Sequence, residues 1–211
     1  RKFRNNKFEL FVDVGNVGPP YQPGHVHSDT LSFILHVKNT PVFVDTGVST
    51  YEKNEKRQTE RQTSAHNTVV INGEDQTEVW GGFRVAKRAQ IISLKEGIDY
   101  VQAEHDGYKN LGVRHLRRFV IGNSRIQIVD EIINNASYVQ TAYFHLHPSI
   151  TNLVIDHNKF IIEDNIIVML TGTNVVIQRE MYDFAEGFNK TRQALRIKVS
   201  FESNLETDIQ L

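Results

Sequence analysis

Two histidines separated by one residue, His25-Val26-His27, are the side chains of this sequence best suited to chemistry. Asp29 follows at the same spacing, and apolar residues continue from Leu31. Because successive side chains of a strand point to opposite faces, these odd-numbered positions would share one face. Ionisable groups on an apolar face are costly unless they have partners, and a metal ion or an anionic substrate is a usual partner for clustered imidazoles. The alternative is the start of a strand whose polar residues lie at its solvated end.

Two further segments carry the same types of side chain. Asp45 directly follows the apolar run 41–44, and His66 shortly precedes the run 69–71. If three neighbouring strands hold these residues, two imidazoles and one carboxylate lie close together. Zinc is bound by histidine nitrogens and carboxylate oxygens, and three protein ligands leave a fourth position open for water. We therefore predict a zinc site formed by His27, Asp45 and His66.

Short strand-like runs separated by turns make up almost the whole chain. Asn39-Thr40 predicts a hairpin that lays Asp45 back beside the histidine segment. Turn residues recur at 72–73, 122–123 and 164–165, between runs rich in Ile, Val and Phe. With no persuasive amphipathic helix, the pattern predicts an all-β fold, an antiparallel β-sandwich that forms one domain over residues 1–211.

The composition narrows the classes of function. The chain has 24 basic and 25 acidic side chains and a formal charge of -1, which argues against a general nucleic-acid binder. It has no cysteine, so disulfides and thiolate metal sites are excluded. No apolar run is long enough to span a bilayer, and we expect no membrane span. The sequence opens on Arg1 without a methionine, so we expect an upstream part of a longer protein.

Three motifs in order give the sequence a family resemblance. The segment 23–33 with its two histidines, the segment 44–47, Tyr51, Arg61 and the segment 65–69 closely resemble the C-terminal β domain of heparinase II/III-like polysaccharide lyases. Alginate lyases of related architecture share the pattern. The resemblance is dense over roughly residues 8 to 90 and looser beyond.

The resemblance implies a second domain, a substrate class and roles for individual residues. In that family the β domain follows an N-terminal α-helical toroid, which this chain lacks, and the active site lies between them. The family's zinc ligands fall on His27, Asp45 and His66, and its catalytic histidine falls on His25. The implied activity is β-elimination on an acidic, uronate-containing polysaccharide, such as a glycosaminoglycan, alginate or a bacterial surface polysaccharide. The resemblance also implies a periplasmic location, and a fragment that binds metal without turning over substrate.

The chemistry of this reaction suits an imidazole. The C5 proton of a uronate is weakly acidic because the adjacent carboxylate is already negative, so charge must be neutralised as an enolate develops. His25 could neutralise that carboxylate or assist proton transfer, and the sequence leaves both open. Zinc could act as a Lewis acid or hold the strands together. We expect the supporting role, because His25 and His27 would lie roughly 7 Å apart along a strand and one metal would not take both.

Side chains around this motif are candidates for substrate contact. Arg57 and Arg61 lie in the charged segment 51–63, which we expect to form a helical turn or a long loop at the mouth of the site. Charged residues of this kind are more often solvated surface than substrate contacts. Tyr51, Trp80 and Phe83 could meet a sugar, although a lone tryptophan is more often packed in the core or at its rim. Asp29 and Asn67 could hold the zinc ligands in place. As polar residues at a strand end, they are also explained without any function.

Three other groups of residues have plainer explanations. The basic cluster 114–118 could meet a polyanion or form the polar face of an edge strand. Asp130 and Glu131 are adjacent on a predicted strand and would face opposite ways, which disfavours a glycosidase pair. A second His-x-His, at His145 and His147, has no nearby carboxylate in the sequence, so we expect a structural role at a strand end.

Two other functional classes compete with the lyase. A non-catalytic carbohydrate-binding or assembly module would use the same sandwich to hold an acidic glycan. A zinc-dependent hydrolase of unrelated fold is disfavoured, because the sequence has no helical metal motif and no obvious general-base glutamate beside the predicted ligands.

Overall fold

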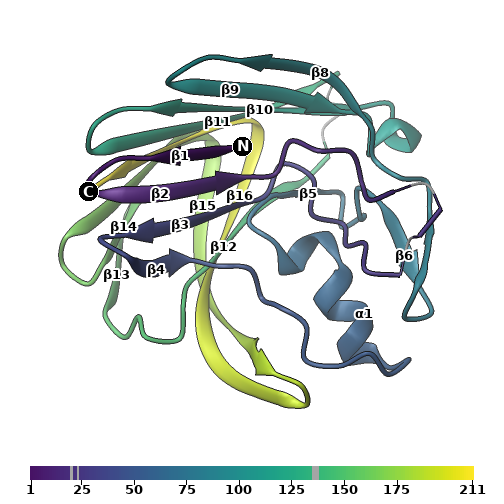
Figure 1. Ribbon diagram of the computed structural model, residues 1–211. Coiled ribbons are helices and arrows are strands. Elements are labelled where there is room, and N and C mark those ends of the chain that lie inside the picture. Colours follow the sequence, from purple (N-terminus) through teal and green to yellow (C-terminus); the bar gives the residue numbers. More distant parts are fainter. Residues whose placement is uncertain (20, 23, 135–137) are drawn as a thin grey trace.

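The computed structural model describes residues 1–19, 21–22, 24–134 and 138–211. Its strands form two large antiparallel sheets and one small ribbon (Figure 1). The smaller of the two large sheets has the order β1 (Lys2–Arg4), β2 (Phe8–Val12), β3 (Phe33–Val37), β4 (Thr40–Phe43). The larger sheet has the order β13 (Leu153–Asp156), β14 (Lys159–Ile162), β15 (Ile166–Gly187), β16 (Lys190–Gln210), β11 (Arg125–Ile133), β10 (Arg114–Ile121), β9 (Tyr100–His105), β8 (Ile91–Glu96). The predicted antiparallel β-sandwich is confirmed.

β12 (Gln140–His145) extends the larger sheet, and several short elements complete the fold. β12 pairs with both β16 and β5 (Val69–Ile71), and thereby joins the segment after His66 to the larger sheet. β6 (Glu78–Trp80) and β7 (Arg84–Ala86) form the ribbon. Helix α1 (Glu55–Arg61) lies at the same end of the molecule as β6 (Figure 1). Short 3-10 turns occupy Thr63–Ala65 and Lys109–Leu111.

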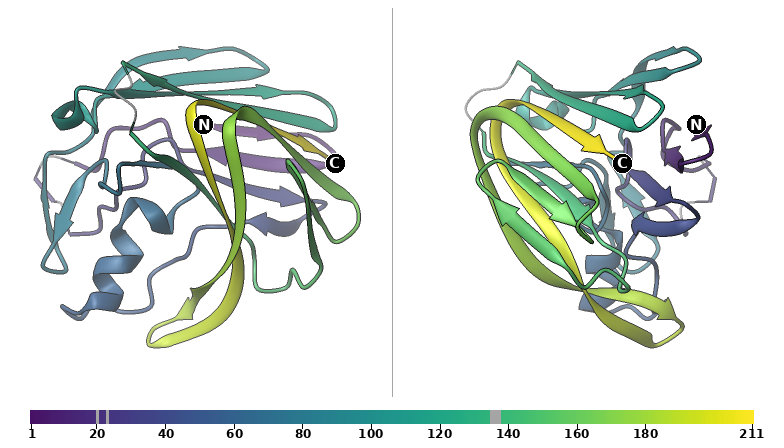
Figure 2. Two further views of the ribbon diagram at one scale, coloured as in Figure 1. Left: turned by 180° about the vertical axis from the view of Figure 1, so that it is seen from behind. Right: turned by 90° about the vertical axis from the view of Figure 1, so that its left-hand side faces the viewer.

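Aromatic side chains join the two sheets across the core. Phe33 of β3 contacts Phe43 of β4, Phe119 of β10 and Phe144 of β12, with ring centroids 5.6, 5.9 and 6.2 Å apart. All four rings are buried. Each buried phenylalanine contributes about 1.5–3 kcal/mol through burial alone. The right-hand view of Figure 2 shows the smaller sheet facing the larger one, which places this aromatic layer between them. Phe33 therefore anchors β3 immediately after the histidine segment.

The predicted turns are mostly confirmed. Lys38 and Asn39 have φ of 49° and 64° and connect β3 to β4, as a two-residue hairpin turn requires. The turns at 122–123 and 164–165 connect paired strands as expected. Asn72-Gly73 forms a tight turn in which Glu74 N donates to the Ile71 carbonyl at 3.0 Å. However, β5 pairs with β12 and not with the strand that follows this turn.

The prediction that His25 and His27 lie on a strand is wrong. The strand begins at Phe33, because Leu31 has a left-handed φ of 62° that interrupts an extended backbone. Two hydrogen bonds hold this bend, from Leu31 N to the Asp13 carbonyl (3.1 Å) and from Asp13 N to the Ser32 carbonyl (2.9 Å). Neither of the other two predicted ligands is in a strand. Asp45 lies two residues beyond β4, and His66 follows a 3-10 turn.

The structure decides between the alternatives for two charged segments: it confirms the helical turn within 51–63 and contradicts the edge strand at 114–118. Residues 55–61 form α1, whose first turn is capped by Asn54 Oδ1, which accepts from Arg57 N at 2.9 Å. The cluster 114–118 is not on an edge strand, because β10 lies between β9 and β11. Arg117 points into the core and is 1% exposed, whereas Arg118 is exposed. Among the described residues, no helix has the length and apolar character that a membrane crossing needs.

Candidate functional site

The histidine loop, residues 24–32, is fastened to α1 by Arg61. Arg61 Nε donates to the Val26 carbonyl at 3.0 Å, and Ser28 N donates to the Arg61 carbonyl at 2.9 Å. Arg61 Nη2 donates to the Arg84 carbonyl at 3.2 Å. The arginine side chain is buried. Its observed contacts are with the backbone that carries His27, and a direct contact with substrate stays a prediction.

Asp45 and His66 form a direct pair. His66 Nδ1 and Asp45 Oδ2 are 2.6 Å apart, and Asp45 Oδ1 accepts from Gly47 N at 2.8 Å. Burial opposes the charged form of His66, but the Asp45 carboxylate outweighs it and raises the pKa of His66 to about 9. Burial likewise opposes charge on Asp45, and His66 overcomes it and holds the pKa of Asp45 well below its usual range. His66 Nε2 is buried and has no hydrogen-bond partner among the described residues.

His27 lies beside this pair. Its ring centroid is 5.3 Å from that of His66, with the planes tilted by 49°. Burial, with the charge of His66 as a second cause, lowers the pKa of His27 to about 3. His27 is therefore neutral near pH 7 and keeps a lone pair, which is the form that binds metals. We call His27, Asp45, His66 and the adjacent Arg57 the site cluster.

The site cluster fits zinc in its donor types and not in its spacing. A neutral imidazole and an ionised carboxylate are donors that zinc takes, and His66, which is protonated near pH 7, would have to release its Nε2 proton to join them. In the described parts of the chain, however, no group of three or more His, Cys, Asp or Glu side chains is arranged to hold a metal ion. Asp45 Oδ2 is engaged by His66 and is not directed to a shared centre. The structure brings the three predicted ligands together, and zinc itself stays a prediction.

An exposed group of rings adjoins the site cluster. His25 is exposed and meets Tyr51 edge to face, with centroids 5.7 Å apart and planes at 81°. Tyr51 stacks parallel to Phe83 with a centroid distance of 6.4 Å and an angle of 6°. The Arg57 guanidinium carbon lies 5.2 Å from the Tyr51 centroid and 6.0 Å from that of Phe83. His25, Tyr51 and Phe83, the ring group, thus lie beside a buried positive charge.

Arg57 connects the ring group to the zinc candidates. Its Nη1 lies 3.4 Å from His27 Nε2. Its Nε and Nη2 donate to the carbonyls of Gly82 and Gly24, at 3.3 and 3.5 Å. Because the side chain is buried, Arg57 acts on its surroundings through its charge and through the position of His27. Its predicted contact with substrate stays a prediction.

Phe83, and not Trp80, is the aromatic residue that joins the ring group. Trp80 lies on β6 opposite Arg84 and is 39% exposed, but none of the ring contacts among the described residues involves it. Phe83 lies in the turn between β6 and β7, where Gly81 and Gly82 have φ of 59° and 80°. The paired glycines before an aromatic residue were the available signal for this exposed ring.

Asp29 lies close enough to the site cluster for its charge to interact with His66 and Asp45. Burial raises the pKa of Asp29, and the charge of His66 opposes that rise. With Asp13 and Asp45 it lines a cavity of about 480 Å³ beside β2 and β3. The expectation that Asp29 supports the zinc ligands stays a prediction, supported by its closeness to His66.

Asn67 joins β3, the residue that follows β4, and β12 through side-chain hydrogen bonds. Its Nδ2 donates to the Phe33 and Val44 carbonyls at 2.8 and 3.0 Å. Its Oδ1 accepts from His145 N at 2.7 Å, and His145 Nδ1 is 3.1 Å away. Asn67 therefore holds the backbone beside Asp45, and a role in supporting the zinc ligands remains a prediction. His145 is buried, and burial lowers its pKa to about 3.

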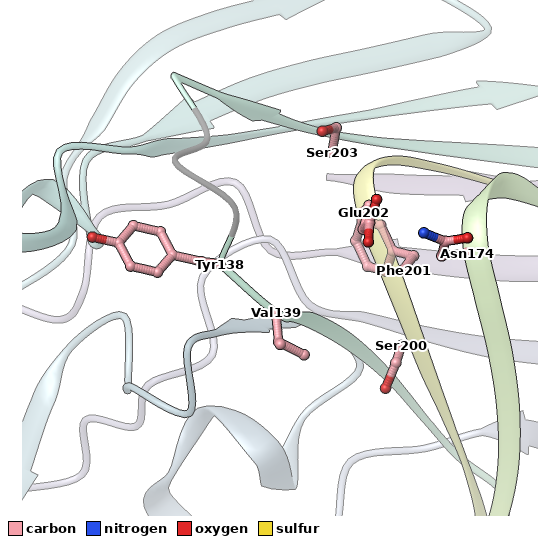
Figure 3. Close-up of a pocket in the computed structure, with 7 residues that line it drawn as sticks. All are labelled: Tyr138, Val139, Asn174, Ser200, Phe201, Glu202 and Ser203. Atoms are coloured by element: carbon pink, nitrogen blue, oxygen red, sulfur yellow. The ribbon is translucent and has the colours of Figure 1, made fainter.

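A separate cavity of about 300 Å³ lies where β12 begins and β15 and β16 bulge. Val139, Asn174, Phe201 and Glu202 are among its lining residues. Figure 3 shows Asn174 and Glu202 close together and the ring of Tyr138 well apart from them. None of the lining residues is a predicted site residue, so this cavity does not extend the site.

Solved structures share this class of fold, a large two-sheet antiparallel sandwich. A crystal structure of heparinase III superposes with a TM-score of 0.77 at 20% identity, over 96% of this chain and 33% of that one. A heparan sulfate lyase from Pedobacter heparinus superposes with a TM-score of 0.74 at 18% identity, over 96% of this chain and 33% of that one. These likenesses establish the fold.

The sequence comparison adds the family. Residues 1–211 match the family model described as heparinase II/III-like, C-terminal. The chain therefore belongs to the heparinase II/III-like family, as its C-terminal domain. A curated relative, the heparin-sulfate lyase of Bacteroides stercoris, is 35% identical over 118 residues, which cover 53% of this chain and 16% of the relative. The chain spans about a third of the length of the solved structures that it matches.

Proposed function

We propose that this chain is the C-terminal part of a polysaccharide lyase that cleaves an acidic, uronate-containing glycan by β-elimination. The observation that carries the proposal is the exposed imidazole of His25, held against Tyr51 and beside the buried charge of Arg57. The names of the relatives, heparin-sulfate and heparan sulfate lyases, support a sulfated glycosaminoglycan as the substrate class. An N-terminal α-toroid completes the active site in this proposal.

In the reaction, a base removes the C5 proton and its electrons form a double bond between C4 and C5. The bond from C4 to the glycosidic oxygen then breaks, and that oxygen takes a proton from an acid. Negative charge builds on the uronate carboxylate as the C5 proton leaves, and a nearby donor or positive charge stabilises it. His25 provides the donor, either as carboxylate neutraliser or in proton transfer, and Arg57 adds a fixed positive field from below the Tyr51 ring.

Zinc has a supporting role in this proposal. His27, Asp45 and His66 would hold the ion, which would tie the histidine loop to the segments after β4 and before β5. The neutral ring of His27 supports this assignment, and His66 would release the proton of its unpartnered Nε2 when the ion binds. Export to the periplasm and an alginate substrate likewise stay predictions.

The test of the catalytic role uses the longer lyase that contains this chain, with His25→Ala beside His157→Ala as control. His157 is an exposed histidine, with 92% of its side chain accessible, so its removal should change nothing. We expect His25→Ala to lower formation of unsaturated product, followed by its ultraviolet absorbance, by a factor of about 100 to 10,000. Unchanged turnover would remove His25 from the mechanism. Glycan affinity without any lyase activity in the unaltered protein would instead favour a binding module.

The metal is tested on this chain by measuring bound zinc after dialysis at neutral pH. We expect about one zinc per chain in the unaltered protein and in His157→Ala, and a large loss in His27→Ala. A parent chain that holds no zinc would remove the metal from the proposal and leave the assignment of His25 standing.

A further inference from the structure

A second group of ionisable side chains lies wholly inside the sandwich, on β9, β10 and β11. Asp130 accepts two hydrogen bonds from Arg117, from Nε to Oδ1 at 2.7 Å and from Nη2 to Oδ2 at 3.0 Å. His115 Nε2 lies 2.6 Å from Asp130 Oδ1, and His105 Nε2 lies 3.2 Å from His115 Nδ1. All four side chains are at most 1% exposed. We call these four residues the buried network.

The hydrogen-bond donor at one end of the network, the backbone N–H of Gly107, determines which nitrogen of each histidine carries the proton. Gly107 N–H can only donate, and it donates to His105 Nδ1 at 3.0 Å, so the proton of His105 is on Nε2. That proton is donated to His115 Nδ1, which leaves the proton of His115 on Nε2, facing Asp130. Both imidazoles are therefore neutral, and the charge of Arg117 is balanced by Asp130 alone.

Two of the three guanidinium nitrogens of Arg117 bind Asp130. The third contacts the histidine loop and the residue that follows His66. Arg117 Nη1 donates to the Leu31 carbonyl at 2.8 Å and to the Asn67 carbonyl at 2.7 Å. Leu31, with its left-handed φ of 62°, is the penultimate residue of the histidine loop, and Asn67 directly follows His66. One planar nitrogen thus fixes the distance between the backbone behind His27 and the backbone beside His66.

We propose that Arg117 is a positioning residue, which sets the spacing between the histidine loop and His66 from inside the core. The expected effect of Arg117 on turnover rests on the proposed function. Its expected effect on the histidine loop rests on the observed contacts alone. Lysine at this position keeps the charge but lacks the planar fork that serves Asp130 and both carbonyls at once. Arg117→Lys should therefore loosen the two segments without removing a charge from the core.

Hydrogen exchange on this chain tests the positioning directly. In Arg117→Lys we expect the amides of Leu31 and Thr68 to exchange on the order of tenfold faster, the equivalent of one lost hydrogen bond. The amides between β11 and β16 should be unchanged. The matched control is Arg125→Lys, because Arg125 also pairs with a carboxylate, Asp208, but its side chain is 56% exposed and does not reach the site. Unchanged exchange at Leu31 and Thr68 in Arg117→Lys would overturn the proposal.

Kinetics of the longer lyase separate positioning from general destabilisation. We expect Arg117→Lys to lower kcat on the order of 100-fold, with KM little changed, because a small misplacement of reacting groups costs that much. Arg125→Lys should leave both constants unchanged. Full kcat in Arg117→Lys would overturn the role in turnover. A parent protein without lyase activity would defeat the proposed function, and the exchange experiment would still decide the positioning.

A measurement on the unaltered chain covers the case in which Arg117→Lys does not fold. The guanidinium of Arg117 makes four hydrogen bonds in the core, so its NMR signals should be separate, with restricted rotation about the Nε–Cζ bond and slow exchange with water. The Arg125 guanidinium should exchange rapidly in the same spectrum. A freely rotating Arg117 would show that it holds neither segment, and the proposal would fail.

Discussion

The site cluster and the buried network have the same composition, two histidines, one aspartate and one arginine, in opposite surroundings. In the buried network each ring nitrogen and each carboxylate oxygen has a partner. In the site cluster His66 Nε2 has no partner among the described residues, and 34% of the Asp45 side chain is accessible. A fully satisfied group of this kind is a structural support. The site cluster, with an unused nitrogen and an accessible carboxylate, can still take a ligand.

The largest difference should appear when each aspartate is removed. Asp130→Ala leaves the buried charge of Arg117 without a counter-charge and should lower the free energy of unfolding by about 3–5 kcal/mol. Asp45→Ala removes a carboxylate that is 34% accessible, and His66 can lose its proton once that partner is gone, so the cost should be smaller, about 1–3 kcal/mol. Denaturant-induced unfolding of both variants measures the two values. Equal costs would show that the two clusters are not structurally distinct.

Zinc should stabilise the chain through one cluster only. If the site cluster binds the ion, zinc at 100 times its dissociation constant raises the free energy of unfolding by about 2.7 kcal/mol. We expect His27→Ala to abolish this gain and His105→Gln to keep it, because the nitrogens of the buried network are already used. Thermal unfolding with and without zinc, with a chelator as blank, provides the measurement. A gain that survives in His27→Ala would place the metal elsewhere.

The buried network should also make stability depend on pH. Burial lowers the pKa of His105 and His115 below the ordinary value of 6.5, so the unfolded chain binds more protons than the folded chain below that pH. Each of these imidazoles therefore favours folding above pH 6.5 and loses that contribution as the pH falls, by about 1.4 kcal/mol per pH unit. We expect the curve of unfolding free energy against pH to be shallower for His105→Gln between pH 6.5 and 5.

The exposed control His157→Gln should keep the parent slope in that experiment, because the side chain of His157 is 92% accessible. Parallel curves of unfolding free energy against pH for His105→Gln and the parent would contradict this prediction. They would mean that His105 is protonated as easily in the folded chain as in water, although both of its ring nitrogens are used in hydrogen bonds.

The smallest effect concerns the two aromatic rings that lie near the two arginines. Arg57 lies 5.2 Å from the exposed Tyr51 ring, and Arg117 lies 5.9 Å from the buried Phe119 ring. Tyr51→Leu should lower the free energy of unfolding by only about 0.5–1 kcal/mol, the value of an exposed cation–π contact. We expect the same variant to weaken binding of an acidic glycan in the longer lyase, measured by calorimetry. Unchanged glycan affinity would limit Tyr51 to packing against His25.

Local chemistry made the fold predictable. Lys38 and Asn39 adopt positive φ because a two-residue hairpin requires it, and the turn residues at 122–123 and 164–165 act in the same way. The order of the His25–His27, Asp45 and His66 motifs was sufficient to indicate the family that the whole-chain match then established. The prediction of a strand through His25 was wrong for an equally local reason, the left-handed backbone conformation of Leu31. Leucine rarely adopts this conformation, and no pattern in the sequence predicts it.

The sequence by itself determined which side chains are present and which turns form, because turn geometry depends on neighbouring residues. Only the tertiary structure decided which aspartate became a support and which stayed accessible, because those outcomes depend on residues far apart in the chain. Arg117 meets Leu31 across 86 positions and Asn67 across 50, and Arg57 meets His27 across 30. Packing of the two sheets and α1 creates these contacts, and burial then fixes the charge of each group.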